Sequence, residues 1–322
     1  MTNKIKIGLV GVGYWGKNLL RNFQSSAATE LVAICESDSS KARTLATQHD
    51  KVQVYQTIES MIAATDIEAV AIATPVGSHY NLAKYALSQG KHVLLEKPIT
   101  VTSAQADELV TIAESLGLTL MCDHTFCFSS PVRTIKDIVS QGMLGEVLLI
   151  NSTRTNLGLF QQDVDVIWDL CPHDLSIFEF LLGENFVVDT IKTTTTNHPA
   201  SEYAADAFVS LKMKNGIVAN IHCSWISPTK KRQFVIVGTE QMLVWDDMAN
   251  EKIKLYDKNV SRTGNTFEYK DRGIAVPVID QTEPLAEMVS HFASCVIHNT
   301  TPISSGKIAA NIVKILETAG EG

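Results

Sequence analysis

The chain has 322 residues, of which 45% are hydrophobic and 19% are charged. This composition excludes a disordered, collagen-like or fibrous chain, and the length predicts two domains. The formal net charge of −8 argues against a nucleic acid or an anionic membrane as a partner.

The cysteine content and the N-terminus bear on the cellular compartment of the protein. Six cysteines are scattered without paired spacing, and no cluster of His, Cys or Asp has the spacing of metal ligands. The first residues have no signal-peptide pattern, and no window approaches 18 consecutive apolar residues. The sequence therefore predicts a cytoplasmic protein with no membrane segment and no metal.

Residues 1–122 alternate between strand-like and helix-like segments. Strands are predicted at residues 5–10, 31–35, 52–55, 69–73, 92–95 and 119–122. Helices are predicted between them, at residues 17–24, 40–49, 57–64, 80–89 and 102–116. This order is typical of an α/β fold with a parallel, doubly wound sheet, and it predicts a Rossmann dinucleotide-binding domain over residues 1–122.

The pattern changes in residues 123–322. Helices are predicted at residues 131–141, 172–182, 283–298 and 307–319. Strands are predicted at residues 147–153, 190–196, 207–213, 216–225, 233–237, 241–245 and 252–256. Consecutive strands joined by turns such as Asn215 and Gly216 predict a large, open, mainly antiparallel sheet. We expect an α+β domain that binds the substrate and forms the oligomer.

A glycine-rich loop follows the first predicted strand and precedes the first predicted helix. Three glycines in this position permit a tight turn, a close approach of the backbone to a pyrophosphate, and close packing of the helix on the strand. The N-terminus of the helix also attracts phosphate. The predicted cofactor-binding residues of this loop are Gly11, Gly13, Tyr14, Trp15 and Gly16.

An acidic residue lies at the distance that this motif requires. Glu36 comes 20 residues after Gly16, at the end of the second predicted strand, and Ser37 follows it. A carboxylate there accepts hydrogen bonds from ribose hydroxyls and repels a 2′-phosphate. Lys41 and Arg43 lie one turn further along, so NAD is favoured over NADP without NADP being excluded.

Three later segments resemble those of a known family. They are ATPVGSH at residues 73–79, GKHVLLEKP at residues 90–98 and WDLCPHD at residues 168–174. Together with the glycine loop, they resemble the glucose–fructose oxidoreductase/inositol dehydrogenase (Gfo/Idh/MocA) family over nearly the whole chain. The resemblance implies an NAD(P)-dependent sugar oxidoreductase.

The resemblance assigns catalysis to Lys97, Asp169 and His173. Lys97 follows a predicted Rossmann strand, where open parallel sheets bind ligands, and its charge can stabilise an alkoxide. Asp169 and His173 are four positions apart at the start of a predicted helix with Pro172 in its first turn, so the carboxylate can orient the imidazole as a base. Which of Lys97 and His173 takes the proton first stays open. Without the resemblance, Lys97 could equally be a solvated surface charge, and Asp169 could be the N-cap of the predicted helix.

Further residues are assigned by the same resemblance and by their position. Thr74, Pro75 and His79 resemble the family's nicotinamide-ribose wall. Glu96 and Lys97 are predicted to bind the cofactor as well, and Glu96 can pair with or orient the lysine. Residues predicted to contact the substrate are His124, Arg154, Asn156 and His173. Arg154 and the basic run at residues 230–232 are candidates for holding a diphosphate or a carboxylate.

The segment WDLCPHD at residues 168–174 resembles the form of this motif found in one subgroup of the family. Members of that subgroup oxidise C3 of a UDP-N-acetylhexosamine or its uronate. The alternatives are a dehydrogenase of a free sugar or inositol, an NAD-dependent glycosidase, and a non-catalytic dinucleotide-binding regulator. The open sheet predicts a homodimer or homotetramer.

Overall fold

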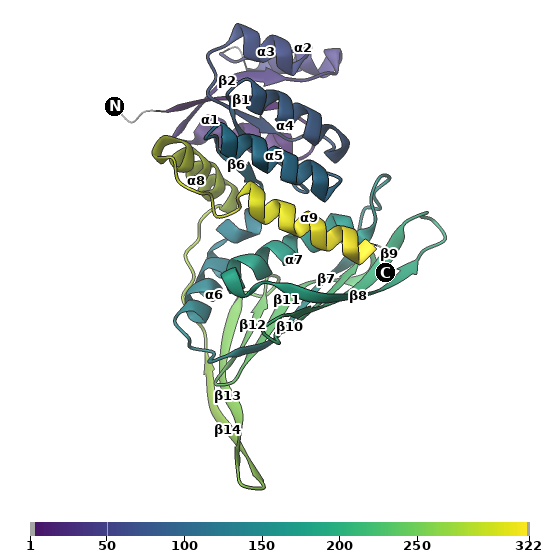
Figure 1. Cartoon of the computed structure of the whole chain (residues 1–322), viewed down its shortest axis with the longest axis vertical. Coiled ribbons are helices and arrows are strands. Elements are labelled where there is room, and N and C mark those ends of the chain that lie inside the picture. Colours follow the sequence, from purple (N-terminus) through teal and green to yellow (C-terminus); the bar gives the residue numbers. More distant parts are fainter. Residues whose placement is uncertain (1–3, 50, 321–322) are drawn as a thin grey trace. The chain divides into compact units, whose positions relative to one another are not determined.

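The computed structural model describes residues 4–49 and 51–320, which form two compact units (Figure 1). Unit 1 comprises residues up to 128 together with 282–314, and unit 2 comprises 129–281 together with the residues from 315 onward. The structure thus divides the chain differently from the predicted domains 1–122 and 123–322. The physical reason is that the helix after residue 282 packs on α1 and η2 of unit 1, and Cys122 N donates to Ser304 O.

In the described part of unit 1, six parallel strands form one sheet in the order β3-β2-β1-β4-β5-β6. The strands are β1 (Ile5–Val10), β2 (Thr29–Cys35), β3 (Gln53–Tyr55), β4 (Ala69–Ile72), β5 (His92–Leu95) and β6 (Leu120–Cys122). The central strands are buried along their length, as expected for a sheet covered on both faces. The predicted Rossmann fold is confirmed.

Five helices connect the described strands of this sheet, and three of them begin at a side-chain cap. They are α1 (Gly16–Ser25), α2 (Ser39–Gln48), α3 (Ile58–Ala64), α4 (His79–Ser88) and α5 (Ser103–Ser115), with 3₁₀ turns η1 (Val76–Ser78) and η2 (Thr125–Phe128). Unit 1 also includes α8 (Pro284–His298) and the residues of α9 (Gly306–Gly320) up to 314, from the end of the chain. Asp38, Thr57 and Thr102 each accept a main-chain hydrogen bond at the start of α2, α3 and α5. In the part of the chain that the structure describes, no helix is long and apolar enough to cross a membrane.

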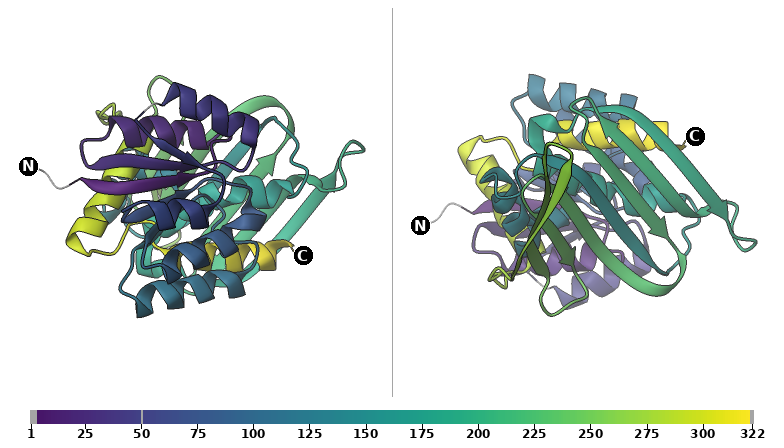
Figure 2. Two further views of the ribbon diagram at one scale, coloured as in Figure 1. Left: turned by 90° about the horizontal axis from the view of Figure 1, so that it is seen from above. Right: turned by 90° about the horizontal axis from the view of Figure 1, so that it is seen from below.

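Unit 2 contains one large sheet with helices on one face. Its described elements are α6 (Ser130–Ser140), β7 (Val147–Leu157), α7 (Val166–Leu182), η3 (Gly183–Asn185), β8 (Val188–Asn197), β9 (Ala204–Met213), β10 (Val218–Ser224), β11 (Ile226–Gly238), β12 (Met242–Asp246), β13 (Ile253–Thr263) and β14 (Thr266–Ala275). The strand order is β14-β13-β12-β11-β7-β10-β9-β8. Along β9, buried and accessible residues alternate, because only one face packs on helices. The right-hand view of Figure 2 looks onto the other face.

Two features of this sheet differ from a simple antiparallel prediction. Strand β10 pairs with β7 in parallel, while the other described neighbours are antiparallel. Strand β14 is missing from the prediction because its residues are exposed and lack apolar alternation. It extends β13 into a long hairpin (Figure 1).

Helix α7 begins earlier than predicted. Its predicted start is near Pro172, whereas the helix begins at Val166 with Asp165 as its N-cap, and Asp165 accepts from Trp168 N. Pro172 lies inside the helix, where it removes one main-chain donor. The prediction of Pro172 in the first turn is therefore wrong, because the cap starts the helix six residues earlier.

Candidate active site

The glycine loop has the geometry that a dinucleotide requires. Gly11 has a φ of +85°, and a Cβ on Gly16 would lie 2.2 Å from Gly11 O, so the turn and the packing of α1 on β1 both need glycine. A Cβ on Gly13 would meet nothing within 4 Å, which leaves its backbone open to a ligand. Trp15, the N-cap residue of α1, makes no side-chain cap. These features fit a pyrophosphate at the start of α1.

Glu36 lies beside this loop. Its Oε2 accepts from Val12 N at 3.2 Å, and its Oε1 accepts from Asp38 N at 3.1 Å. The carboxylate is therefore held where the ribose of a bound dinucleotide would lie. Ser37 is exposed next to it, and Tyr14 in the loop is 93% exposed.

The turn after β4 is tied to the segment after β5 by a buried imidazole. Nδ1 of His79 lies 3.0 Å from Pro98 O, and Nε2 lies 2.8 Å from Thr74 O. Burial lowers the pKa of His79, so the ring is neutral and donates one of these two hydrogen bonds. Both ring nitrogens contact main-chain carbonyls, which indicates that His79 holds the main chain of the predicted ribose wall at Thr74 and Pro75 in place.

Lys97 follows β5 and neighbours two carboxyl groups. Lys97 N donates to Glu96 Oε2 at 2.6 Å. Asp123, which follows β6, is a neighbour of Glu96, because Asp123 N donates to Leu95 O at 2.8 Å. Asp123 Oδ2 accepts from Trp15 Nε1 at 3.0 Å. The carboxyl ends of β5 and β6 are thereby linked to the glycine loop within unit 1.

His124 is a buried imidazole next to this network. It is 1% exposed, and neither of its ring nitrogens has a hydrogen-bond partner within the residues that the structure describes. Burial and the nearby charge of Lys97 lower the pKa of His124 to about 3, so the ring is neutral. A buried polar group without a partner costs about 1–3 kcal/mol, so these nitrogens are suited to a polar ligand atom.

Unit 2 carries the predicted Asp–His pair on α7. Asp169 lies in the first turn, and its Oδ2 accepts from Nε1 of Trp225 at 3.0 Å. His173 lies one turn later and is half-buried. Trp225 is 1% exposed and packs against the ring of Phe160, so the indole holds the carboxylate at a defined place. The segment after β7 is anchored to the same residue, because Gly158 N donates to Trp225 O.

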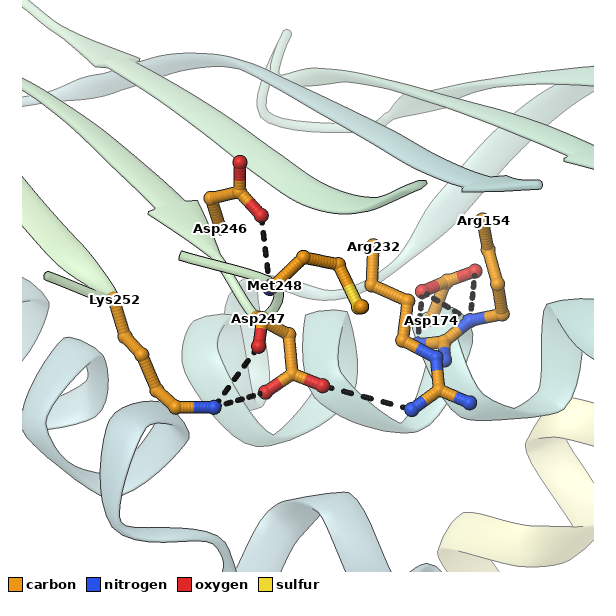
Figure 3. Close-up of polar contacts among 7 residues, drawn as sticks. All are labelled: Arg154, Asp174, Arg232, Asp246, Asp247, Met248 and Lys252. Atoms are coloured by element: carbon orange, nitrogen blue, oxygen red, sulfur yellow. Dashed lines mark hydrogen bonds and ion pairs between the residues drawn. The ribbon is translucent and has the colours of Figure 1, made fainter. Parts of the chain in front are cut away.

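Arg154 is engaged with an acidic residue of α7. Its Nε and Nη2 atoms lie 3.2 and 2.8 Å from Asp174 Oδ1, and both side chains are buried (Figure 3). This ion pair joins β7 to the residue after His173, a structural role that the sequence analysis did not predict. The assignment of Arg154 and Asn156 to the substrate stays a prediction.

The Arg154→Met variant is expected to lose about 3–5 kcal/mol of unfolding free energy, because Asp174 is left as a buried charge without this partner. Chemical denaturation checks this value. The double variant Arg154→Met/Asp174→Leu removes both charges and should recover most of the loss. A small loss in the single variant would contradict the structural role of the pair.

A second charged group lies on the same face of the sheet. Arg232 on β11 pairs in register with Arg154 on β7, so both side chains point to one face. Arg232 Nη1 lies 3.5 Å from Asp247 Oδ2, while Lys252 Nζ lies 2.8 Å from Asp247 Oδ1 (Figure 3). Asp247 is thus closer to Lys252 than to Arg232.

Comparison with known families agrees with this geometry. Residues 5–124 match the oxidoreductase family with an NAD-binding Rossmann fold, and residues 132–244 match the C-terminal domain of the Gfo/Idh/MocA family. The chain belongs to the Gfo/Idh/MocA oxidoreductases. It is therefore an oxidoreductase with an NAD-binding domain.

Several members of the Gfo/Idh/MocA family are similar to this chain. The uncharacterized oxidoreductase YdgJ of Escherichia coli is 33% identical over 59% of the chain, a match that spans 57% of YdgJ. D-apiose dehydrogenase of Paraburkholderia graminis is 22% identical over 98% of the chain and 86% of its own length. UDP-N-acetylglucosamine 3-dehydrogenase of Acidithiobacillus ferrooxidans is 23% identical over 84% of the chain and 82% of its own length. The structure of the latter covers 98% of this chain and 97% of its own, with a TM-score of 0.83 and 20% identity, which shows a common fold.

Glu36 offers a direct test of cofactor choice in this family member. Glu36→Gln keeps an acceptor for Val12 N but removes the charge that repels a 2′-phosphate. We expect the preference for NAD over NADP to fall about tenfold, which equals about 1.4 kcal/mol. Titration with NADH and NADPH measures both Kd values, and Glu30→Gln, an exposed change on β2, is the control. An unchanged ratio would contradict the proposed role of Glu36.

Sequence reasoning missed two residues of the candidate site. Trp225 and Asp123 touch the predicted residues Asp169 and Trp15, respectively, yet they lie far away in the sequence. The only sequence signal for Asp123 is its place after a predicted Rossmann strand. Trp225 lies at the end of a predicted strand and has no motif around it.

Proposed function

We propose that the chain oxidises a secondary hydroxyl of a nucleotide-activated sugar, such as C3 of a UDP-N-acetylhexosamine or its uronate. The observation that carries the proposal is the Asp169 carboxylate, held by Trp225 one helical turn before His173. A half-buried imidazole next to a fixed carboxylate is suited to remove a hydroxyl proton. The relative that oxidises UDP-N-acetylglucosamine supports the nucleotide sugar as substrate.

Each residue has a defined task in this proposal. His173 removes the hydroxyl proton, and Asp169 orients its ring. Lys97 stabilises the negative charge that develops on the reacting oxygen, and the neutral ring of His124 supplies a donor or an acceptor to the sugar. NAD, when bound, accepts the hydride from the carbinol carbon. Arg232 is proposed to hold the diphosphate, since a guanidinium binds phosphate oxygens well.

The experiment is a titration of the purified protein at stoichiometric NAD. UDP-N-acetylglucosamine, its uronate, D-apiose, glucose and inositol are added separately while NADH absorbance is followed, and the nucleotide released by denaturation is identified by mass. A rise with a UDP-sugar that His173→Ala abolishes is the expected result. A rise only with a free sugar or polyol would overturn the nucleotide-sugar assignment.

A dehydrogenase of a free sugar is the second candidate. D-apiose dehydrogenase matches the chain over 98% of its length, which favours this class over the glycosidase and regulator alternatives. The same titration separates the two candidates. Arg232→Gln is an independent test, because it should raise the KM for a UDP-sugar about tenfold or more and leave the KM for a free sugar unaffected.

We propose further that the protein is a homodimer or homotetramer formed through the face of the unit 2 sheet that lies away from α7. Phe208 on this face is 54% exposed, and the whole of β14 is exposed as well. Exposed apolar side chains on an open sheet are typical of an interface. Light scattering at micromolar concentration is expected to give two or four chains, and a monomer would contradict the proposal.

A further inference from the structure

Two carboxyl groups lie close together at the ends of β5 and β6. Leu95 pairs with Cys122 in the parallel register and Asp123 N donates to Leu95 O, so the side chains of Glu96 and Asp123 follow neighbouring strands within hydrogen-bond reach of each other. A hydrogen bond between two carboxyl groups requires that one of them carries a proton. The position of this proton sets which of the two groups is charged next to Lys97.

The pattern of donors decides in favour of Glu96. Asp123 Oδ2 accepts from Trp15 Nε1, and Asp123 Oδ1 accepts from the Thr125 hydroxyl, so both oxygens of Asp123 are already acceptors of other groups. Glu96 accepts from Lys97 N at Oε2, which leaves Oε1 for the proton. The ionised form is therefore better stabilised at Asp123 than at Glu96.

The charges around the pair act in the same direction. Burial and the Asp123 carboxylate raise the pKa of Glu96 well above its usual value, and Lys97 opposes this only in part. Burial also raises the pKa of Asp123, but its three hydrogen bonds and Lys97 act against that change. The Cys122 thiol beside them is neutral, because burial raises its pKa as well.

We propose that Glu96 is a protonated positioning residue, which ties the main chain of Lys97 through the ionised Asp123 to Trp15 in the glycine loop. The inference rests on the proposed function, because it concerns the placement of Lys97. Trp15 precedes the first turn of α1, so this chain of hydrogen bonds sets the place of Lys97 relative to the loop. The pair carries one negative charge instead of two, which reduces repulsion of an oxygen that becomes negative.

The pH dependence of folding tests the proton without any substrate. In the unfolded chain Glu96 ionises near a pKa of about 4.3, while in the folded chain its pKa is raised, so the folding equilibrium constant falls by up to tenfold per pH unit as the pH rises above that value. Glu96→Gln cannot ionise. The ratio of its folding constant to that of the wild type should therefore rise between pH 5 and pH 7, and the exposed Glu114→Gln should give a flat ratio.

Two outcomes would overturn the proposal. If the ratio of folding constants rises with pH for Asp123→Asn and stays flat for Glu96→Gln, the proton is on Asp123. If the ratio is flat for both variants, neither carboxyl group holds a proton in the folded chain. Infrared spectra of the wild-type chain at pH 7 give a measurement that needs no variant. The C=O band of a protonated carboxyl should shift with ¹³C-labelled glutamate, and a shift with ¹³C-labelled aspartate alone would contradict the assignment.

The positioning role has its own kinetic readout. With the substrate that the titration identifies, Glu96→Gln should have a kcat at least about tenfold above that of Glu96→Ala, because only glutamine can still join Lys97 N to Asp123. Equal kcat values would refute positioning. If no substrate reacts, the proposed function fails while the folding and infrared results still decide where the proton lies.

Discussion

The Lys97→Met variant is expected to lose about 10²–10³-fold in kcat. Methionine keeps the length and the apolar part of the side chain but lacks the ammonium group that would stabilise negative charge on the reacting oxygen. Removal of one such donor typically has an effect of this size. Steady-state kinetics with the substrate found in the titration measure the change.

Matched measurements separate this loss from misfolding. The Kd for NADH should change far less than kcat, because the other predicted cofactor contacts, among them the glycine loop and Glu36, stay in place. Lys84→Met, an exposed change on α4 that breaks the ion pair with Glu108, is the control and should stay within about twofold. Full activity in Lys97→Met would contradict the proposed role of the Lys97 ammonium group in catalysis.

The Rossmann half could be predicted from the sequence because its signals are local. Each buried strand is a short apolar run, and two glycines of the loop meet a steric need that the structure confirms: Gly11 has a positive φ, and a Cβ on Gly16 would lie 2.2 Å from Gly11 O. The acidic residue 20 positions later lies beside the loop for the same reason. Local patterns therefore sufficed to position Glu36 and Lys97 at the same edge of the sheet.

The second half was harder because its determinants lie far apart in the sequence. The parallel pairing of β10 with β7 joins residues that are about 70 positions apart, as between His222 and Thr153. No turn sequence specifies such a pairing. Strand β14 has exposed side chains on both faces, so it has no alternation to detect. The early start of α7 depends on a single cap, Asp165, which a nearby proline obscured.

The candidate site shows the same division. Arg154 is predicted to contact the substrate because an arginine is a common ligand of a diphosphate or a carboxylate, but no sequence signal indicates its buried partner Asp174 on α7. No sequence signal indicates that Trp225 donates to Asp169 either. Residue types and spacing identify chemical groups, whereas their partners depend on the packing of distant strands.

The pair on α7 leads to a graded series of variants. His173→Ala removes the proposed base and is expected to lower kcat about 10²–10⁴-fold, the usual contribution of general base catalysis. Asp169→Asn keeps an acceptor for Trp225 Nε1 but loses the charge that stabilises a protonated imidazole, so we expect an intermediate loss. Trp225→Phe keeps an aromatic ring and removes only the donor to Asp169, so its loss should be the smallest, about tenfold.

The chain supplies a matched control for this series. His222 on β10 also contacts an aspartate, with Nε2 3.0 Å from Asp206 Oδ2, but its side chain lies on the sheet face opposite Cys223, which contacts Cys171 of α7. His222→Ala should therefore stay within about twofold in kcat, measured together with the oligomeric state. Equal losses in His222→Ala and His173→Ala would show that removal of any histidine in unit 2 disturbs the fold. A loss confined to α7, in the order His173, Asp169 and Trp225, is what a base oriented by a fixed carboxylate requires.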